Sequence, residues 1–323
     1  MGDGTKIEWT EATWNPLRGC RRVSAGCEHC YAETTAHRFS GEGQPYEGLT
    51  VIGRRGPRWS GEVRLVPEHL ADPLRWQRPR RVFVNSMSDL FFEPVPFEYI
   101  AAVFGVMAAS PRHTFQVLTK RPERAAAFLA WLEGRAEYDA RRDATLGHDE
   151  ARGMILRRCA QDQGIAHRSL LASAIAPWPL RNVWLGVSVE DQPTADLRLT
   201  QLLALAASVR WASYEPALGP VDFAPYLRPR LPGSPDGARA AVGLDWIVVG
   251  GESGKGARLF DLDWCRTTIA AGRAAGVPVF AKQKGANATD LGVAVAFDHP
   301  KGGDWGEWPE ALRVREYPAS VSP

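Results

Sequence analysis

The chain has 323 residues, of which 45% are hydrophobic and 24% are charged, as in ordinary globular proteins with one large α/β domain or two smaller ones. Its 39 basic and 37 acidic residues leave a formal net charge of +2, which excludes a strong overall field toward nucleic acid. No apolar segment approaches the ~20 residues that cross a bilayer and no signal-peptide pattern precedes the first motif, so we expect a cytoplasmic protein without a membrane partner.

The first predicted strand, around residues 13–17, leads into the stretch GCRRVSAGCEHCY. This stretch holds Cys20, Cys27 and Cys30, three of the five cysteines, in the spacing C-x6-C-x2-C. An odd, clustered set of cysteines in a chain of this size does not indicate a disulfide framework, whereas thiolates in a reducing compartment are available for metal. Three thiolates on one glycine-containing loop predict a [4Fe-4S] cluster with one iron that lacks a protein ligand.

Two other uses of the same cysteines stay open. A zinc ion could be held by Cys20, Cys27, Cys30 and a histidine, either His29 or His37, because zinc sites tolerate such spacings. A redox pair of Cys27 and Cys30 is a further alternative, although the pair does not open a helix in a thioredoxin-like unit. Cys159 and Cys265 stand alone in predicted helices, where we expect small buried hydrophobic residues.

The rest of the chain alternates short apolar runs with helix-like segments. The runs are almost continuously hydrophobic, which predicts strands buried on both faces of a parallel sheet; they cover residues 81–86, 114–119, 182–188, 209–213, 245–250 and 277–282. Helices are predicted over residues 96–109, 122–132, 194–207 and 262–274. Seven βα-like units with right-handed crossovers predict an α/β fold, a partial or nearly closed (β/α) barrel of parallel strands forming one domain over residues 1–323.

Four segments depart from the βα repeat. We expect a cluster loop at residues 18–31, a charged, arginine-rich inserted helical segment at about residues 133–176, and an irregular C-terminal extension at about residues 286–323. Residues 229–242 are rich in proline and glycine and are predicted to form a loop.

Polar residues directly follow the predicted strands. In a βα barrel the loops after the carboxyl ends of the strands build the site, so we expect one polar pocket at the mouth that also carries the cysteines. The segments concerned are 85–89, 119–121, 188–191, 213–216, 250–254 and 282–284. The GGESG segment lets backbone approach an anion closely, but it lacks the spacing of a phosphate loop for nucleoside triphosphates.

Ordered motifs along the chain carry a family resemblance: TKIEWTEATWNPLRGCRRVSAGCEHCYAE, VNSMSDLF, LTKRPER, LGVSVEDQ, YEPALGP, WIVVGGESG and AKQKG. From Thr5 to about Trp308 the chain resembles a bacterial and phage family of proteins of unknown function, the Gp37/Gp68-like phage proteins, whose members are radical S-adenosylmethionine (SAM)-like. The resemblance implies a radical SAM-like barrel with a [4Fe-4S] cluster on Cys20, Cys27 and Cys30. It further implies SAM as a ligand of the open iron, an external electron donor, and a 5′-deoxyadenosyl radical that modifies a substrate.

The resemblance also implies roles for the strand ends. Residues expected to bind the cofactor are Ser86, Ser88 and Asp89 near the SAM amino group, Ser188 and Glu190 near its ribose or carboxylate, and Gly250, Gly251 and Glu252 from a later strand. Glu215, Lys120 and Lys282 are the candidate catalytic residues at the same mouth. The chain departs from the commonest radical SAM pattern in its longer first cysteine gap and in having residues 85–89 where a glycine-glycine-glutamate motif is usual.

The leading hypothesis is therefore a radical SAM-type enzyme, with the choice among lyase, transferase and oxidoreductase left open. Arginine runs, Lys120, Arg121 and twelve tryptophans favour nucleic acid or a nucleotide as substrate. The alternative is a non-catalytic zinc- or cluster-stabilised barrel that recognises nucleic acid or a protein partner.

Overall fold

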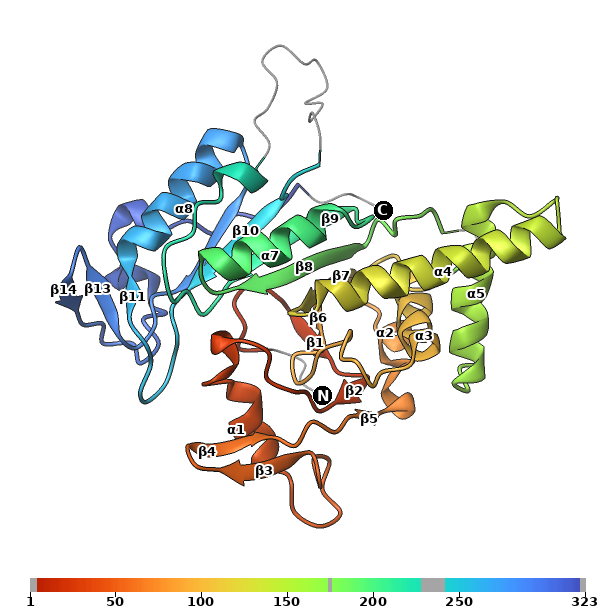
Figure 1. The fold of residues 1–323 in the computed structure, drawn as a ribbon, viewed down its shortest axis with the longest axis horizontal. Coiled ribbons are helices and arrows are strands. Elements are labelled where there is room, and N and C mark those ends of the chain that lie inside the picture. Colours follow the sequence, from red (N-terminus) through yellow and green to blue (C-terminus); the bar gives the residue numbers. More distant parts are fainter. Residues whose placement is uncertain (1–4, 174–175, 228–241, 320–323) are drawn as a thin grey trace.

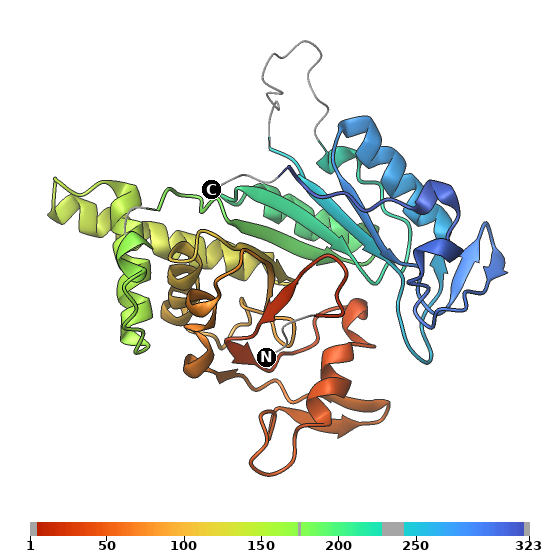
Figure 2. The same cartoon turned by 180° about the vertical axis from the view of Figure 1, so that it is seen from behind.

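The computed structural model describes residues 5–173, 176–227 and 242–319 (Figures 1 and 2). Its centre is a sheet of seven parallel strands in the order β1-β6-β7-β8-β9-β10-β12. The strands are β1 (Ala12–Trp14), β6 (Arg81–Val84), β7 (Thr114–Thr119), β8 (Val183–Val189), β9 (Val209–Tyr214), β10 (Trp246–Gly250) and β12 (Val279–Gln283). Because β1 and β12 lie at opposite edges, the sheet is a curled half-barrel, which confirms the predicted parallel α/β architecture in its partial form.

Helices that follow the strands cover one face of this sheet (Figure 1). They are α3 (Phe97–Ala108), α4 (Pro122–Arg142), α7 (Gln192–Leu203) and α8 (Leu262–Ala275). α7 begins at Gln192 because Asp191 and Thr194 form a reciprocal capping box. α4 is ten residues longer than predicted, since the glutamates, alanines and arginines that follow residue 132 are good helix formers.

Two further helices occupy the inserted segment, α5 (His148–Asp162) and α6 (Leu170–Ser173). α5 packs closely on α3: a Cβ on Gly105 would lie 2.5 Å from the carbonyl oxygen of Leu156, so only glycine permits this approach. Cys159 is buried in α5. The loop predicted at residues 229–242 lies outside the described residues, except for its last residue.

The N-terminal part of the chain adds a lobe beside the sheet. It contains β2 (Leu17–Arg18) paired with β5 (Arg64–Leu65), α1 (Tyr31–His37), the β3 (Thr50–Gly53) and β4 (Gly56–Trp59) hairpin, and the short α2 (Asp72–Arg75). In Figure 1, α1 and the hairpin stand out below the sheet.

The C-terminal segment contributes a small second sheet. β11 (Phe260–Asp261) pairs with β13 (Ala288–Asp290), which pairs with β14 (Val293–Val295). Short 3-10 helices follow at Trp305–Glu307 and Glu310–Leu312. The chain then returns to the main sheet, where the Ala281 amide donates to the carbonyl oxygen of Val314 at 2.8 Å.

The face of the sheet opposite these helices carries a tryptophan layer, which consists of the buried residues Trp9, Trp184, Trp211 and Trp246. Its indole rings contact one another, with ring centroids 5.3 Å apart for Trp9 and Trp211. Since strand residues alternate between faces, Gly186, Ser188 and Ser213 lie on this same face nearer the carboxyl ends. Bulky aromatic rings therefore fill the amino half of the curled sheet, and the Trp211 ring also covers Gly186, where a Cβ would lie 2.4 Å from Trp211 Cε2.

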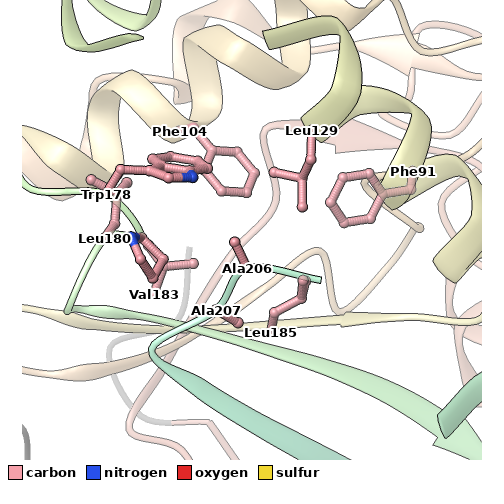
Figure 3. Close-up of a pocket in the computed structure, with 10 residues that line it drawn as sticks. Phe91, Phe104, Leu129, Trp178, Leu180, Val183, Leu185, Ala206 and Ala207 are labelled. Atoms are coloured by element: carbon pink, nitrogen blue, oxygen red, sulfur yellow. The ribbon is translucent and has the colours of Figure 1, made fainter. Parts of the chain in front are cut away.

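Two hollows lie near the amino ends of the strands, away from the polar pocket predicted at their carboxyl ends. A cavity of about 20 Å³, lined by Phe104, Trp178, Val183 and other apolar residues, lies between β8 and the helices (Figure 3). Its size and apolar lining mark it as a packing gap rather than a ligand site. A larger hollow of about 720 Å³ lies where β9, β10 and β12 begin. None of the described helices has the length and apolar character needed to cross a membrane.

Candidate cofactor site at the carboxyl ends of the strands

The cysteine loop, residues 18–31, lies at the carboxyl ends of the strands. It turns at Gly19, which has φ +96° and whose Cβ, if present, would lie 2.2 Å from the carbonyl oxygen of Glu62. Gly19 therefore satisfies both a left-handed backbone and a close approach, which no other residue does without strain. The loop then forms a 3-10 turn at Ala25–Cys27, and α1 begins at Tyr31 directly after Cys30.

The three thiols of this loop are free and half-buried. Burial raises the pKa of Cys20 to about 12, with a further increase from Asp89. Burial also raises the pKa of Cys30. The thiols of Cys20 and Cys30 therefore stay protonated at neutral pH unless a bound cation replaces the proton.

The side chains of the loop are not arranged as a preformed site for a single metal ion. Among the described residues, no three His, Cys, Asp or Glu side chains are gathered closely enough to hold one metal ion. A zinc ion, with Zn–S bonds of about 2.3 Å, needs thiolate sulfurs within about 4 Å of one another. In a [4Fe-4S] cluster each thiolate binds a different iron, so the sulfurs stand farther apart.

The two histidines considered as a fourth zinc ligand are placed differently. His37 ends α1, about 10 Å along the helix from Cys30, and its Nδ1 contacts Thr50 Oγ1 at 3.1 Å. His29 lies within the loop, and its Nδ1 is 2.8 Å from Glu252 Oε2. Only His29 is therefore near the thiols.

Glu190, at the carboxyl end of β8, binds the cysteine loop. Its carboxylate accepts a hydrogen bond from Ser24 Oγ at 2.8 Å and from Arg198 Nη1 at 3.1 Å, and Lys120 Nζ lies 3.5 Å away. Glu190 and Arg198 are both buried. The carboxylate fits tightly against the loop, because a Cβ on Gly26 would lie 2.3 Å from Glu190 Oε1.

Glu252, after β10, holds the other side of the same loop. Arg258 donates to its carboxylate from the backbone amide, Nε and Nη2, at 2.6–3.1 Å. Arg258 Nη1 also donates to the carbonyl oxygen of Ala25 at 2.8 Å. Burial alone would raise the pKa of Glu252, but the hydrogen bonds from Arg258 and His29 outweigh it and lower the pKa.

Asp89, after β6, is the third buried carboxylate of the site. It accepts hydrogen bonds from Thr119 Oγ1 at 2.8 Å, the Lys120 amide at 3.0 Å and Arg121 Nη1 at 3.0 Å. Arg121 in turn donates to the carbonyl oxygen of Arg21 at 2.8 Å and lies 3.9 Å from Cys20 Sγ. Arg121, which we expected to favour nucleic acid, is buried in this network and does not reach a surface ligand.

The two predicted serines of this region also contact the chain around the loop. Ser88 Oγ donates to the carbonyl oxygen of Leu17 at 2.9 Å, and Ser86 Oγ donates to Asn15 Oδ1 at 3.2 Å. The amide of Gly251 donates to the carbonyl oxygen of Gln283 at 3.0 Å, and Gly250 accepts from the Ala217 amide. Most of the predicted cofactor-binding groups are thus engaged with protein, and the three carboxylates among them hold the cysteine loop.

Other polar groups at the mouth are less engaged. Glu215 Oε1 and Lys282 Nζ form a half-buried ion pair at 2.6 Å. No hydrogen bond of the Ser188 hydroxyl is found within the described chain, and Asn85 Oδ1 is buried there without a partner. Tyr31, next to Cys30, donates to the carbonyl oxygen of Ser86 at 2.7 Å.

Sequence reasoning missed the partners of the carboxylates. Ser24, Arg198 and Arg258 were not singled out, although they complete the networks of Glu190 and Glu252. The sequence could have indicated Arg198, because an arginine in the helix that follows a strand can reach a carboxylate at the carboxyl end of that strand. No local pattern marks Ser24.

Comparisons with known proteins give one family. The model of a family described as a protein of unknown function, DUF5131, matches residues 4–309. No curated protein and no solved structure matches the chain.

Proposed function

Because the chain belongs to the DUF5131 family, whose description assigns no activity, we propose from its own residues that it is a radical SAM-type enzyme, in which Cys20, Cys27 and Cys30 hold a [4Fe-4S] cluster. The observation that carries the proposal is three free thiols on one loop, fixed by buried carboxylates over the carboxyl ends of a parallel half-barrel. When bound, the cluster and SAM supply one-electron chemistry that ends in a 5′-deoxyadenosyl radical.

The chain's own groups bind and orient around that chemistry. Ser188 and Ser213 present small side chains on the same face of the sheet as the tryptophan layer, near the carboxyl ends of β8 and β9. The Ser188 hydroxyl and the unpartnered Asn85 Oδ1 can bind polar atoms of SAM.

Other residues at the mouth can transfer protons, supply positive charge or position the cysteine loop. Glu215 and Lys282 place an acid and a base 2.6 Å apart at the mouth, where they can hold or move a substrate proton. Lys120 stands beside Glu190 and adds a positive charge. The buried carboxylates Asp89, Glu190 and Glu252 act by positioning the loop, and an external donor can reach it because His29 and Tyr31 are exposed.

Metal and sulfide analysis after anaerobic reconstitution tests the cluster. We expect about four irons per chain and a broad absorption near roughly 400 nm. Changing Cys20, Cys27 or Cys30 to alanine should abolish both, whereas Cys159→Ala should keep them because Cys159 is buried in α5. Dithionite-reduced protein should then cleave SAM to 5′-deoxyadenosine and methionine. A protein that holds the cluster but neither binds nor cleaves SAM would contradict the proposed activity.

A zinc-stabilised binding module is the second candidate, and one contact favours it. His29 Nδ1 is held by the Glu252 carboxylate, an arrangement that often orients a histidine whose Nε2 binds a metal. Stoichiometric zinc without labile sulfide, lost on His29→Ala, would support this candidate against the cluster.

A further inference from the structure

The β3–β4 hairpin, residues 50–59, is strongly basic in a chain that is almost neutral. We call it the arginine hairpin, because its ten residues TVIGRRGPRW include Arg54, Arg55 and Arg58 and no acidic residue. All three arginines are exposed, and the side chain of Arg55 is 86% exposed. Figures 1 and 2 both show the hairpin standing out from the body of the protein beside α1.

These guanidinium groups are available to a ligand. Arg55 has one acidic neighbour, Glu28 at 3.9 Å, and a long exposed pair of this kind contributes little. Arg54 and Arg58 form no ion pair with any residue that the structure describes. The Glu28 contact also places the tip of the hairpin next to the cysteine loop.

Exposed aromatic rings lie on the helix that packs against the hairpin. Tyr31 begins α1 and is 55% exposed, and Phe39, just after its end, is 51% exposed. α1 is joined to the hairpin by Glu33, whose carboxylate accepts from the Trp59 amide at 3.0 Å, and by the contact of His37 with Thr50. Basic groups and exposed aromatic rings therefore lie in the same N-terminal lobe. Tyr31, which directly follows Cys30, lies where this lobe meets the cofactor site.

This combination of groups matches one class of partner. Guanidinium groups bind phosphate in a bidentate way, and exposed aromatic rings stack on unpaired bases. A duplex keeps its bases stacked inside the helix, so it offers no unpaired base to these rings. We propose that the arginine hairpin and α1 bind single-stranded nucleic acid and bring it to the cysteine loop. That the strand is the substrate rests on the proposed function, whereas the binding itself does not.

Fluorescence anisotropy with short labelled single strands of DNA and RNA tests the surface on the whole chain, reconstituted anaerobically and without SAM. For single strands the logarithm of affinity falls with the logarithm of salt by about 0.7 per phosphate contact. The triple change Arg54→Ala, Arg55→Ala and Arg58→Ala should therefore reduce the slope by about 2 and weaken binding at least tenfold.

A second variant tests the stacking contact. Phe39→Ala should weaken single-strand binding by about 5- to 150-fold, because one base–aromatic stack is lost, and should leave the salt slope unchanged. The matched control is Arg141→Ala with Arg142→Ala, at the far end of α4, which should change neither affinity nor slope. A larger loss in this control than in the hairpin variant would overturn the proposal.

Competing partners give different results. A preference for duplex of the same sequence, or equal binding of polyglutamate with no effect of Phe39→Ala, would replace the proposal by a duplex-binding or acidic-protein surface. Failure of the nucleic-acid experiment is distinguishable from failure of the proposed function, since SAM cleavage by the reduced protein is measured without any strand present. The hairpin variants should retain that cleavage.

Discussion

Removal of the Glu190 carboxylate should destabilise the protein and free the cysteine loop. Glu190 is 1% exposed and Arg198 is 5% exposed, and their charges lie 3.1 Å apart. Without the carboxylate, Arg198 keeps, among the described residues, only the carbonyl oxygen of Ser188 as an acceptor, at 2.8 Å, and its charge stays buried. Ser24, at 2.8 Å from Glu190, loses its link to the sheet.

The expected cost follows from that uncompensated charge. Breaking a buried ion pair by removing one partner typically costs about 3–5 kcal/mol. The hydrogen bond from Ser24 adds about 1 kcal/mol at most, because water replaces part of it. Glu190→Ala should therefore lower the free energy of unfolding by about 3–5 kcal/mol, a large share of the 5–15 kcal/mol typical of folded proteins.

Urea unfolding under reducing conditions measures the stability of the metal-free protein, and chelator-driven iron release measures how firmly the loop is held. Exposed Glu137, which pairs with Arg141 at 3.4 Å on α4, gives a control: Glu137→Ala should cost less than about 1 kcal/mol. The double variant Glu190→Leu with Arg198→Met removes both charges, so it should recover most of the stability while iron release stays fast. A cost below about 1 kcal/mol for Glu190→Ala, or no recovery in the double variant, would refute the reasoning.

Three further changes test the packing. Gly26→Ala would place a Cβ 2.3 Å from Glu190 Oε1, so we expect the free energy of unfolding in urea to fall by about 1–3 kcal/mol and iron release to become faster. The control Gly134→Ala, in open space on α4, should raise the free energy of unfolding by about 0.5–1 kcal/mol in the same titration. Val183→Ile adds one methylene beside the 20 Å³ cavity and should raise stability by about 0.8 kcal/mol in thermal unfolding; a lower midpoint would contradict this. Burial lowers the pKa of the Lys284 ammonium in the folded protein, so the unfolded chain binds this proton more tightly. Stability should therefore rise with pH until the pKa of lysine in the unfolded chain, about 10.4, is reached. Lys284→Met should therefore stabilise the fold more at pH 7 than at pH 10; the same gain at both would count against it.

The strands of the sheet were predictable because each is a buried apolar run. The run at residues 114–119 matches β7 at both ends, and five other runs differ by at most two residues at each end. The first strand, predicted around residues 13–17, ends three residues earlier, since β1 is Ala12–Trp14. The arginine hairpin was not predicted, since its residues are largely exposed and lack a clear alternation of apolar and polar side chains. Residues 133–142 were predicted to belong to the inserted helical segment and instead continue α4, because the charged outward face beyond residue 132 hides the continuing helical period.

Local sequence also determined where the candidate site lies. Three closely spaced cysteines follow the first strand, and polar residues follow the others, so the connectivity of a parallel sheet alone gathers them at one mouth. The roles of those residues were decided by the tertiary structure. Glu190 meets Ser24 across 166 residues of chain, and Glu252 meets His29 across 223. A buried carboxylate must find a positive or hydrogen-bonding partner, and which partner it finds depends on the curvature of the sheet and the path of the loop, neither of which is written in the residues around the carboxylate.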